Sequence, residues 1–345
     1  MQHVLTKYMF DPSGRNIVLV GLIRLGNWLQ IFGNFVPISM MLTLETVKFL
    51  QGNLMGMDDL LTASNGIECG VQSSNLNEEL GQIEYVFSDK TGTLTCNEMR
   101  FKHLIVGNTS YGEERGYTGD MSYVKNVDFE DPRLWKKIRT NFPQEEDKLL
   151  QQCIYLLGIC HNVVLEENGD YNASSPDELA FVYFAKLVQC EFKGKDEDNN
   201  IVMEIGHVNK TFKLLDLFEF DSDRKRMSVI VKDSTGHITM YCKGADSIMI
   251  PRYHPERKHH FDDVMQRVEE YAQIGLRTLL LGYKTMTEDE YEQFKAEYEI
   301  AKNNLDNREV EMSKVEDKYE RDLTLIGATA IEDRLQDEVR RVRFT

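Results

Sequence analysis

The chain begins with a long apolar stretch. Most residues from Ile17 to Leu50 are hydrophobic, and Trp28–Lys48 has about the 20 residues that a transmembrane helix requires. A buried helix of a soluble protein is the alternative that hydropathy leaves open. Pro37 lies inside this segment, where it removes a backbone donor and clashes with the preceding turn. The pattern therefore predicts one transmembrane helix at 27–51 that kinks or unwinds at Pro37.

A polar segment and a short apolar run follow. Asp58–Asn77 has small and polar residues without a clean period, which is typical of a stalk or linker. The run Ile83–Phe87 has the residue types of a β-strand. We expect this strand to be buried on both faces of a parallel α/β sheet.

Beyond Thr95 the apolar spacing predicts a mixture of helices and antiparallel strands. The predicted helices are Leu149–Val164, Pro176–Val188, Phe261–Gly275 and Glu288–Lys318. The predicted strands are Phe212–Glu219, Met227–Lys232, His237–Cys242 and Leu323–Ala330, the last returning to the α/β core. The layout is nested, with a large α+β domain inserted into an α/β core.

Composition narrows the classes of function. The chain has 57 acidic and 40 basic residues, and its formal charge of −17 argues against nucleic acid as a partner. A hydrophobic content of 41% suffices for a buried core. The six cysteines include no C-x-x-C pair, which favours free thiols in a reducing cytosol over a zinc or redox site.

The candidate chemistry starts directly after the predicted strand. Asp89 opens the motif Asp-Lys-Thr-Gly-Thr-Leu-Thr, at the end of a strand where α/β sheets bind ligands. A carboxylate nucleophile there would attack ATP and form an acyl phosphate. Lys90 can neutralise charge on the phosphoryl group, and the hydroxyl of Thr91 can donate a hydrogen bond to it. Gly92 permits a close turn of the backbone.

Thr91 also separates two kinds of enzyme. In aspartate-based phosphatases of this general fold, the residue two positions after the nucleophile is usually a second Asp that acts as general acid and base. A threonine cannot carry a proton at neutral pH. We therefore expect a phosphoenzyme that persists and drives a conformational change, as in a pump.

The motif at 89–95 resembles the signature of the P-type ATPases. The resemblance implies a partial HAD-like (Rossmann-type) phosphorylation domain with an inserted α+β nucleotide-binding domain, preceded by a transmembrane helix. It also implies ATP as substrate and Mg²⁺ as cofactor, the metal being held by Asp89 and by the carbonyl of Thr91. Catalytic domains of this family lie in the cytoplasm, attached to an integral membrane portion.

Four further segments resemble the family's nucleotide pocket. By this resemblance Glu178 contacts adenosine, Phe220 stacks on adenine, Lys243 lies in the pocket and Arg277 reaches the phosphates. Taken singly, each has an ordinary structural alternative. Phe220 would be a core residue, Lys243 a surface cation, Arg277 half of a salt bridge, and Glu178 a first-turn helix residue.

The stretch around Pro37 indicates the transport substrate. Cation pumps place a carboxylate beside this proline, whereas 34–40 is Asn-Phe-Val-Pro-Ile-Ser-Met. It resembles the type-IV subfamily, the phospholipid flippases. That resemblance implies a lipid path past the kink, with Asn34 and Ser39 touching the headgroup and Ile38 acting as an apolar gate. It also implies the membrane and a possible accessory glycoprotein subunit as partners.

Several family segments are absent, namely the D-G-E-T loop and the later T-G-D and G-D-G-x-N-D segments. The sequence therefore predicts a fragment of an ATP-driven phospholipid-translocating ATPase. A catalytically inactive nucleotide-binding module and a portion of a cation pump remain as alternatives. The expected organisation is an unassigned segment at 1–26, a transmembrane helix at 27–51, a stalk with the first part of the phosphorylation domain at 52–97, a nucleotide-binding domain at 98–322, and a return to the phosphorylation domain at 323–345.

Overall fold

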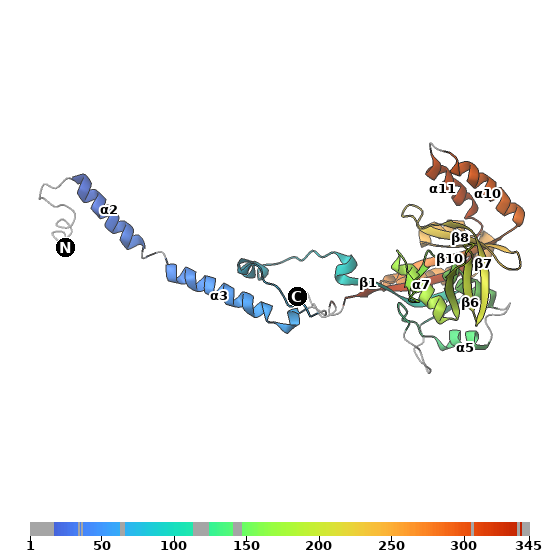
Figure 1. Cartoon of the computed structure of the whole chain (residues 1–345), viewed down its shortest axis with the longest axis horizontal. Helices are drawn as coiled ribbons and strands as arrows, with labels where there is room; N and C mark the ends of the chain where they lie inside the picture. The colour runs from blue at the N-terminus through green and yellow to red at the C-terminus, as the bar shows by residue number, and fades with distance from the viewer. Residues whose placement is uncertain are drawn as a thin grey trace. The chain divides into compact units, whose positions relative to one another are not determined.

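The computed structural model describes residues 17–33, 35, 37–62, 66–112, 124–140, 147–304, 307–336 and 339. The chain divides into two compact units, Met1–Phe87 and Ser88–Thr345. Figure 1 shows helices only in the first unit and a large sheet with flanking helices in the second.

The first unit consists of short and medium helices joined by extended chain. Gly52 is its one buried residue among those described. The elements are α2 Ile17–Gly33, α3 Ile38–Gly56, η1 Asp59–Leu61, η2 Ser74–Leu76 and α4 Asn77–Leu80.

The predicted helix at 27–51 is interrupted at its proline. Helix α2 ends at Gly33, and α3 starts at Ile38 directly after Pro37. The expectation of a kink or unwound turn at Pro37 is therefore confirmed, because proline cannot continue the hydrogen-bond ladder of the preceding helix. No helix among the described residues is both long and apolar enough to span a membrane. Asn34, assigned to the lipid path, lies outside the described residues.

The second unit is built on a nine-stranded sheet in the order β2-β1-β11-β10-β9-β8-β7-β6-β5. Every pairing within it is antiparallel. The strands are β1 Thr95–Val106, β2 Thr109–Tyr111, β5 Cys190–Lys195, β6 Ile201–Ile205, β7 Val208–Phe218, β8 Arg226–Lys232, β9 Ile238–Gly244, β10 Arg277–Met286 and β11 Thr324–Leu335, with a separate hairpin of β3 Val164–Leu165 and β4 Tyr171–Asn172.

Helices and short turns connect these strands. They are the turn η3 Lys90–Leu94, the helices α5 Pro132–Thr140, α6 Lys148–Ile159, α7 Pro176–Leu187, α8 Asp246–Met249, α9 Phe261–Gln273, α10 Glu288–Lys302 and α11 Arg308–Tyr319, and the 3-10 turns η5 Ile250–Arg252 and η6 Pro255–Arg257. The predicted helices at 176–188 and 261–275 and the three predicted antiparallel strands are confirmed. The helix predicted at 149–164 is shorter in the structure, because α6 ends at Ile159 and Val164 belongs to β3.

The helix predicted at 288–318 is two helices in the structure. Helix α10 ends at Lys302, and α11 begins at Arg308. The intervening sequence Asn-Asn-Leu-Asp-Asn is rich in residues whose side chains compete for the local backbone and favour turns.

Two strand predictions need correction. Ile83–Phe87 forms no strand, and Phe87 is 96% exposed. A strand needs a neighbour for its backbone N–H and C=O groups, and no segment among the described residues pairs with this one. Leu323–Ala330 does form most of β11, but this strand lies between β1 and β10 of the antiparallel sheet. It does not return to a separate parallel core, so the inserted domain continues past residue 322.

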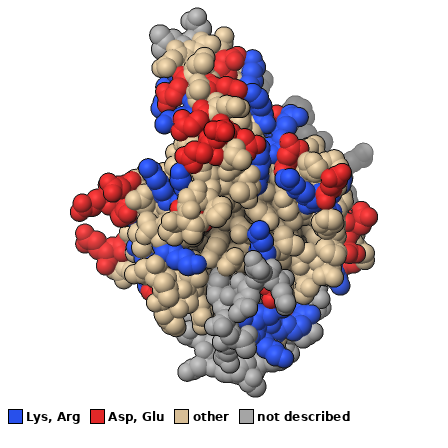
Figure 2. Space-filling model, turned by 90° about the vertical axis from the view of Figure 1, so that its right-hand side faces the viewer, with Lys and Arg blue, Asp and Glu red and all other residues tan. Residues whose placement is uncertain are grey.

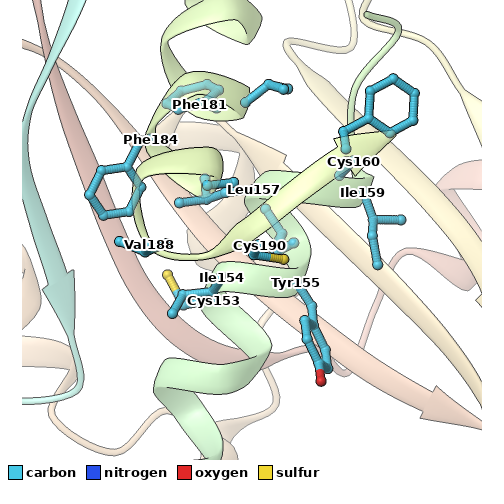
Figure 3. Packing of buried hydrophobic residues seen from close by; sticks show 14 of the residues in the cluster. Cys153, Ile154, Tyr155, Leu157, Ile159, Cys160, Phe181, Phe184, Val188 and Cys190 are labelled. Carbon is cyan, nitrogen blue, oxygen red and sulfur yellow. The ribbon is translucent and has the colours of Figure 1, made fainter. Parts of the chain in front are cut away.

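Alternation along the central strands divides the core into two layers. Val229 and Val231 face the cluster that contains α6 and α7, whereas Ile230 faces the cluster that contains α10. Figure 3 shows Leu157 of α6 and Phe181 and Phe184 of α7 among the buried apolar side chains of the first of these clusters. Helix α7 and the ends of β8, β9 and β10 form walls of the cleft described next.

Candidate nucleotide-binding site

A cleft of about 630 Å³ opens between α7, the β7–β8 turn and the ends of β9 and β10. This volume lies in the range of small-molecule sites. Its lining residues are Asn162, Ser174, Ser175, Asp177, Glu178, Phe181, Glu219, Phe220, Ser222, Lys225, Met227, Lys243, Gly244, Ala245, Arg277, Thr278 and Leu279. The four residues that the family resemblance assigned to a nucleotide pocket, Glu178, Phe220, Lys243 and Arg277, are all among them.

Lys243 is the buried cation of the cleft. Its side chain is 6% exposed, and its Nζ lies 3.5 Å from Glu178 Oε1. The ammonium group also lies 5.0 Å from the centroid of the Phe181 ring, a cation–π arrangement. A buried ammonium needs such partners, because an unpaired charge away from water is costly. Lys243 is thus not the surface cation that its sequence alone would favour.

Arg277 lies at the rim of the cleft at the start of β10. Its Nη1 donates hydrogen bonds of 2.9 Å to both carboxylate oxygens of Asp177 in the first turn of α7. The side chain of Arg277 is 52% exposed, so part of the guanidinium group remains open to the cleft and to solvent. The salt bridge that the sequence left as the alternative role of Arg277 is therefore present. A bound phosphate would have to share the guanidinium group with Asp177 or displace the Asp177 carboxylate from it.

Phe220 is presented by the turn between β7 and β8. The residue is 63% exposed, which excludes the core role that a lone phenylalanine would usually have. Lys225 lies in the same turn with φ +49, and its N–H donates a 2.7 Å hydrogen bond to the carbonyl of Asp221. A left-handed conformation is uncommon for a lysine and persists only where the surroundings fix it.

His161 and Asn162 were not singled out from the sequence. Asn162 donates from its backbone N–H to Glu178 Oε2 at 3.1 Å and from Nδ2 to Glu219 Oε1 at 2.9 Å. It therefore orients two carboxylates of the cleft. Its sequence signal was only a polar pair, His161-Asn162, directly after an apolar helix.

His161 forms hydrogen bonds to the backbone on both sides of Asn162. Its Nε2 lies 2.8 Å from the carbonyl of Gly158, and its Nδ1 accepts from the N–H of Val163 at 3.1 Å. These partners require the neutral tautomer with a proton on Nε2. Burial, and next the charge of nearby Lys243, lower the pKa of His161 to about 3.

The phosphorylation motif forms the turn before β1. Asp89 is exposed, and its Oδ1 accepts from the backbone N–H of Lys90 at 2.8 Å. Lys90 Nζ donates to Asp333 Oδ2 at 2.7 Å. The turn bends at Thr91 and at Gly92, whose φ of +78 favours glycine.

The structure does not bring Asp89 into the cleft. Arg277 is opposite Ile331 in the sheet, and Thr95 is opposite Leu335. Four residues of strand separate these two rows, which is about 13 Å at 3.3 Å per residue. Asp89 lies on a further turn before Thr95, so the motif and the cleft are two separate places on one unit.

The cleft fits a nucleotide in its chemistry. Phe220 offers an exposed aromatic face for a base, Lys225 and Arg277 supply cations for phosphates, and the buried Lys243 supplies a cation for a polar edge of the nucleotide. The fit to Mg²⁺ is partial. No group of three or more His, Cys, Asp or Glu side chains suited to a metal occurs among the described residues. Mg²⁺ is often held by one or two carboxylates with waters and substrate phosphates, and Asp89 with the Thr91 carbonyl matches that smaller set.

The visible surface of the second unit carries both signs of charge. Figure 2 shows acidic and basic side chains interspersed over the α10–α11 hairpin at the top of the view. Several form ion pairs, such as Lys318 with Glu297 at 2.7 Å. The net negative charge of the chain therefore coexists with a local group of basic side chains at the cleft.

Comparison with known proteins defines the class. Residues 147–338 match the family model of the P-type ATPase cytoplasmic domain N, which is more than half of the chain. The chain belongs to the P-type ATPase family. This match extends through β11, in agreement with the place of that strand in the sheet.

The similar relatives have phospholipid-transporting names. The chain is 39% identical over 321 residues to phospholipid-transporting ATPase DRS2 of Saccharomyces cerevisiae, covering 90% of this chain and 23% of that protein. It is 34% identical to phospholipid-transporting ATPase IC of Xenopus tropicalis (96% and 27%). It is also 34% identical to probable phospholipid-transporting ATPase 4 of Arabidopsis thaliana (95% and 31%). The chain thus spans 23% to 31% of the length of these relatives.

Proposed function

We propose that this chain binds ATP in the cleft beside α7 and is the catalytic portion of a phospholipid-translocating P-type ATPase. The observation that carries the proposal is the convergence of Glu178, Phe220, Lys243 and Arg277 on one cleft of about 630 Å³. These four residues come from α7, the β7–β8 turn, β9 and β10. The names of the relatives favour a phospholipid over a cation as the transported species.

Each residue has a role that its surroundings support. Phe220 stacks on the adenine, and Glu178, oriented by Asn162, accepts hydrogen bonds from the adenosine. Lys243 holds a polar edge of the nucleotide, and Arg277 exchanges part of its bond with Asp177 for the phosphates. Gly244 lets β9 pack closely against the turn that carries Lys225, since a side chain there would meet Arg226.

Asp89 is the proposed nucleophile. A carboxylate oxygen attacks the γ-phosphorus, the bond to the bridging oxygen breaks, and ADP leaves. Lys90 stabilises charge on the transferred group after leaving Asp333. Bound Mg²⁺, held by Asp89 and the Thr91 carbonyl, would neutralise phosphate charge. Asp89 lies in the turn before Thr95, whose row in the sheet is about 13 Å from the row of Arg277. Transfer therefore requires the nucleotide and the motif to approach each other.

The remaining assignments concern the whole protein. The proposal includes a HAD-like phosphorylation domain to which Asp89 would belong. It also includes a membrane portion around Pro37, with the catalytic domains in the cytoplasm. The lipid headgroup would pass Pro37, Ile38 and Ser39, where the helix is interrupted. An accessory glycoprotein subunit belongs to the same proposal.

An inactive nucleotide-binding module is the second candidate. It is favoured by one observation, the exposed position of Asp89 outside any strand. The two candidates share the cleft and differ only at Asp89.

Binding of ATP by the purified chain tests the shared claim. We expect Phe220→Ala to weaken ATP binding about tenfold or more, because base–aromatic stacking contributes about 1–3 kcal/mol. The dissociation constant is measured by isothermal titration calorimetry, and Ile300→Ala is the control. Ile300 is 74% exposed on α10, outside the cleft, so its loss should leave the affinity unchanged. Equal effects of the two substitutions would refute the assigned cleft.

ATP labelled on its γ-phosphate, added to the same purified chain, distinguishes the two candidate functions. Acid-stable label that Asp89→Asn removes supports the enzyme. Retained nucleotide without acid-stable label supports the inactive module.

A further inference from the structure

A buried ionic network lies beneath the turn that carries Phe220. Its centre is Glu320, which is 0% exposed at the end of α11. The Glu320 carboxylate accepts from Arg224 Nη2 and from Arg226 Nε, both at 2.6 Å, and from Ser228 Oγ at 2.5 Å. A buried carboxylate is tolerated when charged donors satisfy its oxygens in this way. The pair of arginines brackets Lys225, a residue of the cleft.

Two more carboxylates of α11 extend the network. Glu316 Oε2 lies 3.2 Å from Arg224 Nη1, and Asp317 Oδ1 accepts from Arg226 Nη2 at 3.1 Å. Residues 316 and 320 are one helical turn apart, so they lie on the same face of α11. That face is joined to the start of β8 by ion pairs rather than by apolar packing alone.

The network also holds the backbone of the turn. Arg224 Nη1 donates to the carbonyl of Glu219 at 3.1 Å, across the turn from its own position. The carbonyl of Lys225 accepts from the N–H of Ala245 at 3.1 Å. These bonds connect both ends of 219–225 to fixed elements. Phe220 is mostly exposed, so its place depends on this backbone and not on packing of its own ring.

We propose that Glu320 is a positioning residue for the nucleotide. It fixes Arg224 and Arg226, and through them the turn that directs Phe220 and Lys225 into the cleft, without touching the ligand. The inference rests on the proposed nucleotide site and deepens it. It means that the α10–α11 hairpin, remote from the chemistry, sets nucleotide affinity.

The test replaces Glu320 by glutamine in the full chain. Glutamine keeps the volume but lacks the charge, and its amide group opposes the arginine donors. We expect the dissociation constant for ATP to rise about tenfold, within the usual range of coupling between residues that do not share a contact. The control is Asp131→Asn. Asp131 is also 0% exposed and accepts from Arg133 Nη2 at 2.6 Å, but neither residue lines the cleft.

A double-substitution cycle separates positioning from general destabilisation. If Glu320 acts through Phe220, then Glu320→Gln adds less to Phe220→Ala than it costs alone. A comparable rise in the dissociation constant for Asp131→Asn, or full additivity with Phe220→Ala, would overturn the proposal. Should Glu320→Gln not fold, Arg224→Lys keeps the charge but loses the fork that bridges Glu219, Glu316 and Glu320. Unchanged affinity in that variant would overturn it equally.

Amide hydrogen exchange gives a readout that needs no nucleotide. Glu320→Gln should speed exchange at Lys225 and Ala245, whose N–H groups close the turn, whereas Asp131→Asn should not. If the unsubstituted chain binds no ATP, the proposed function fails while this exchange still decides whether Glu320 holds the turn. Unaltered exchange at both amides would refute the proposal that Glu320 positions the turn.

Discussion

The two units use their apolar residues in opposite ways. In the first unit, Phe35 is 77% exposed and Ile38 is 69% exposed. In the second unit, Phe101 and Phe184 are completely buried, with ring centroids 3.9 Å apart. Both segments look hydrophobic in the sequence, yet only one finds its partners within the described chain.

This difference shows what a hydrophobic pattern specifies. Alternating strands and periodic helices in the second unit supply each other's burial, so the pattern determines a core. The helices of the first unit have no such partner among the described residues. Exposed apolar surface of this extent marks contact with protein or membrane. It therefore supports the proposed membrane portion around Pro37.

The sharpest way to break this comparison is to remove a ring from each unit. Phe184→Ala should cost about 4 kcal/mol of unfolding free energy, because it leaves a cavity against Phe101. Phe35→Ala should change the stability of the second unit by less than about 0.5 kcal/mol. Urea unfolding followed by the fluorescence of Trp135, which packs against the core cluster, measures both. Similar costs would show that the two units share one core.

Acid offers a second test, since His161 belongs to the buried unit. The folded pKa of His161 is about 3, below its ordinary value near 6.5. Folding therefore favours the neutral ring, and its contribution is complete above pH 6.5 and declines as pH falls towards 3. At pH 4.5 the loss should be about 3 kcal/mol, two pH units at about 1.4 kcal/mol each.

A matched pair of histidine substitutions isolates this effect. His161→Gln should flatten the decline in stability between pH 6.5 and 4.5, because glutamine does not titrate. His207→Gln should leave the decline unchanged, since the side chain of His207 is 85% exposed. Urea midpoints across this pH range provide the measurement, and identical profiles for the two variants would refute the assignment.

The sequence predicted the second unit better than the first for a physical reason. Helix α7 has proline at its first position and apolar residues at helical spacing, so local signals agree with tertiary packing. Strand β1 was not predicted, because its residues 96–102, Cys-Asn-Glu-Met-Arg-Phe-Lys, mix charged with apolar side chains. The strand takes its place in the sheet from pairing with β11. Ile83–Phe87 has the residue types of a strand but no pairing partner in the part of the chain that the structure describes. A short stretch of sequence does not specify which distant strand it will pair with.

The site shows the same limit. The family resemblance predicted that Glu178, Phe220, Lys243 and Arg277 belong together, and the fold brings them to one cleft. It did not reveal that Lys243 is paired with Glu178 or that Arg277 is paired with Asp177. Such pairings depend on strand register and helix orientation, which residue types alone do not specify.

Two glycines sharpen the comparison at the smallest scale. A Cβ on Gly244 would lie 2.7 Å from Arg226 Cβ and 2.9 Å from the carbonyl oxygen of Lys225. Gly244→Ala should therefore cost about 2 kcal/mol through overpacking, and it should displace the turn that lines the cleft. A Cβ on Gly21 in α2 would meet nothing within 4 Å. Gly21→Ala should instead stabilise its helix by about 0.5–1 kcal/mol, because alanine loses less backbone entropy.

The two substitutions have opposite signs only if the units differ as described. Urea unfolding monitors Gly244→Ala in the second unit, and amide hydrogen exchange along α2 monitors Gly21→Ala in the first. Slower exchange in α2 would show that the stability of this helix is limited by the helix propensity of its own residues. A loss of protection there would mean that Gly21 packs closely against a surface that the described residues do not supply, and small residues are the usual means by which helices approach each other in a membrane.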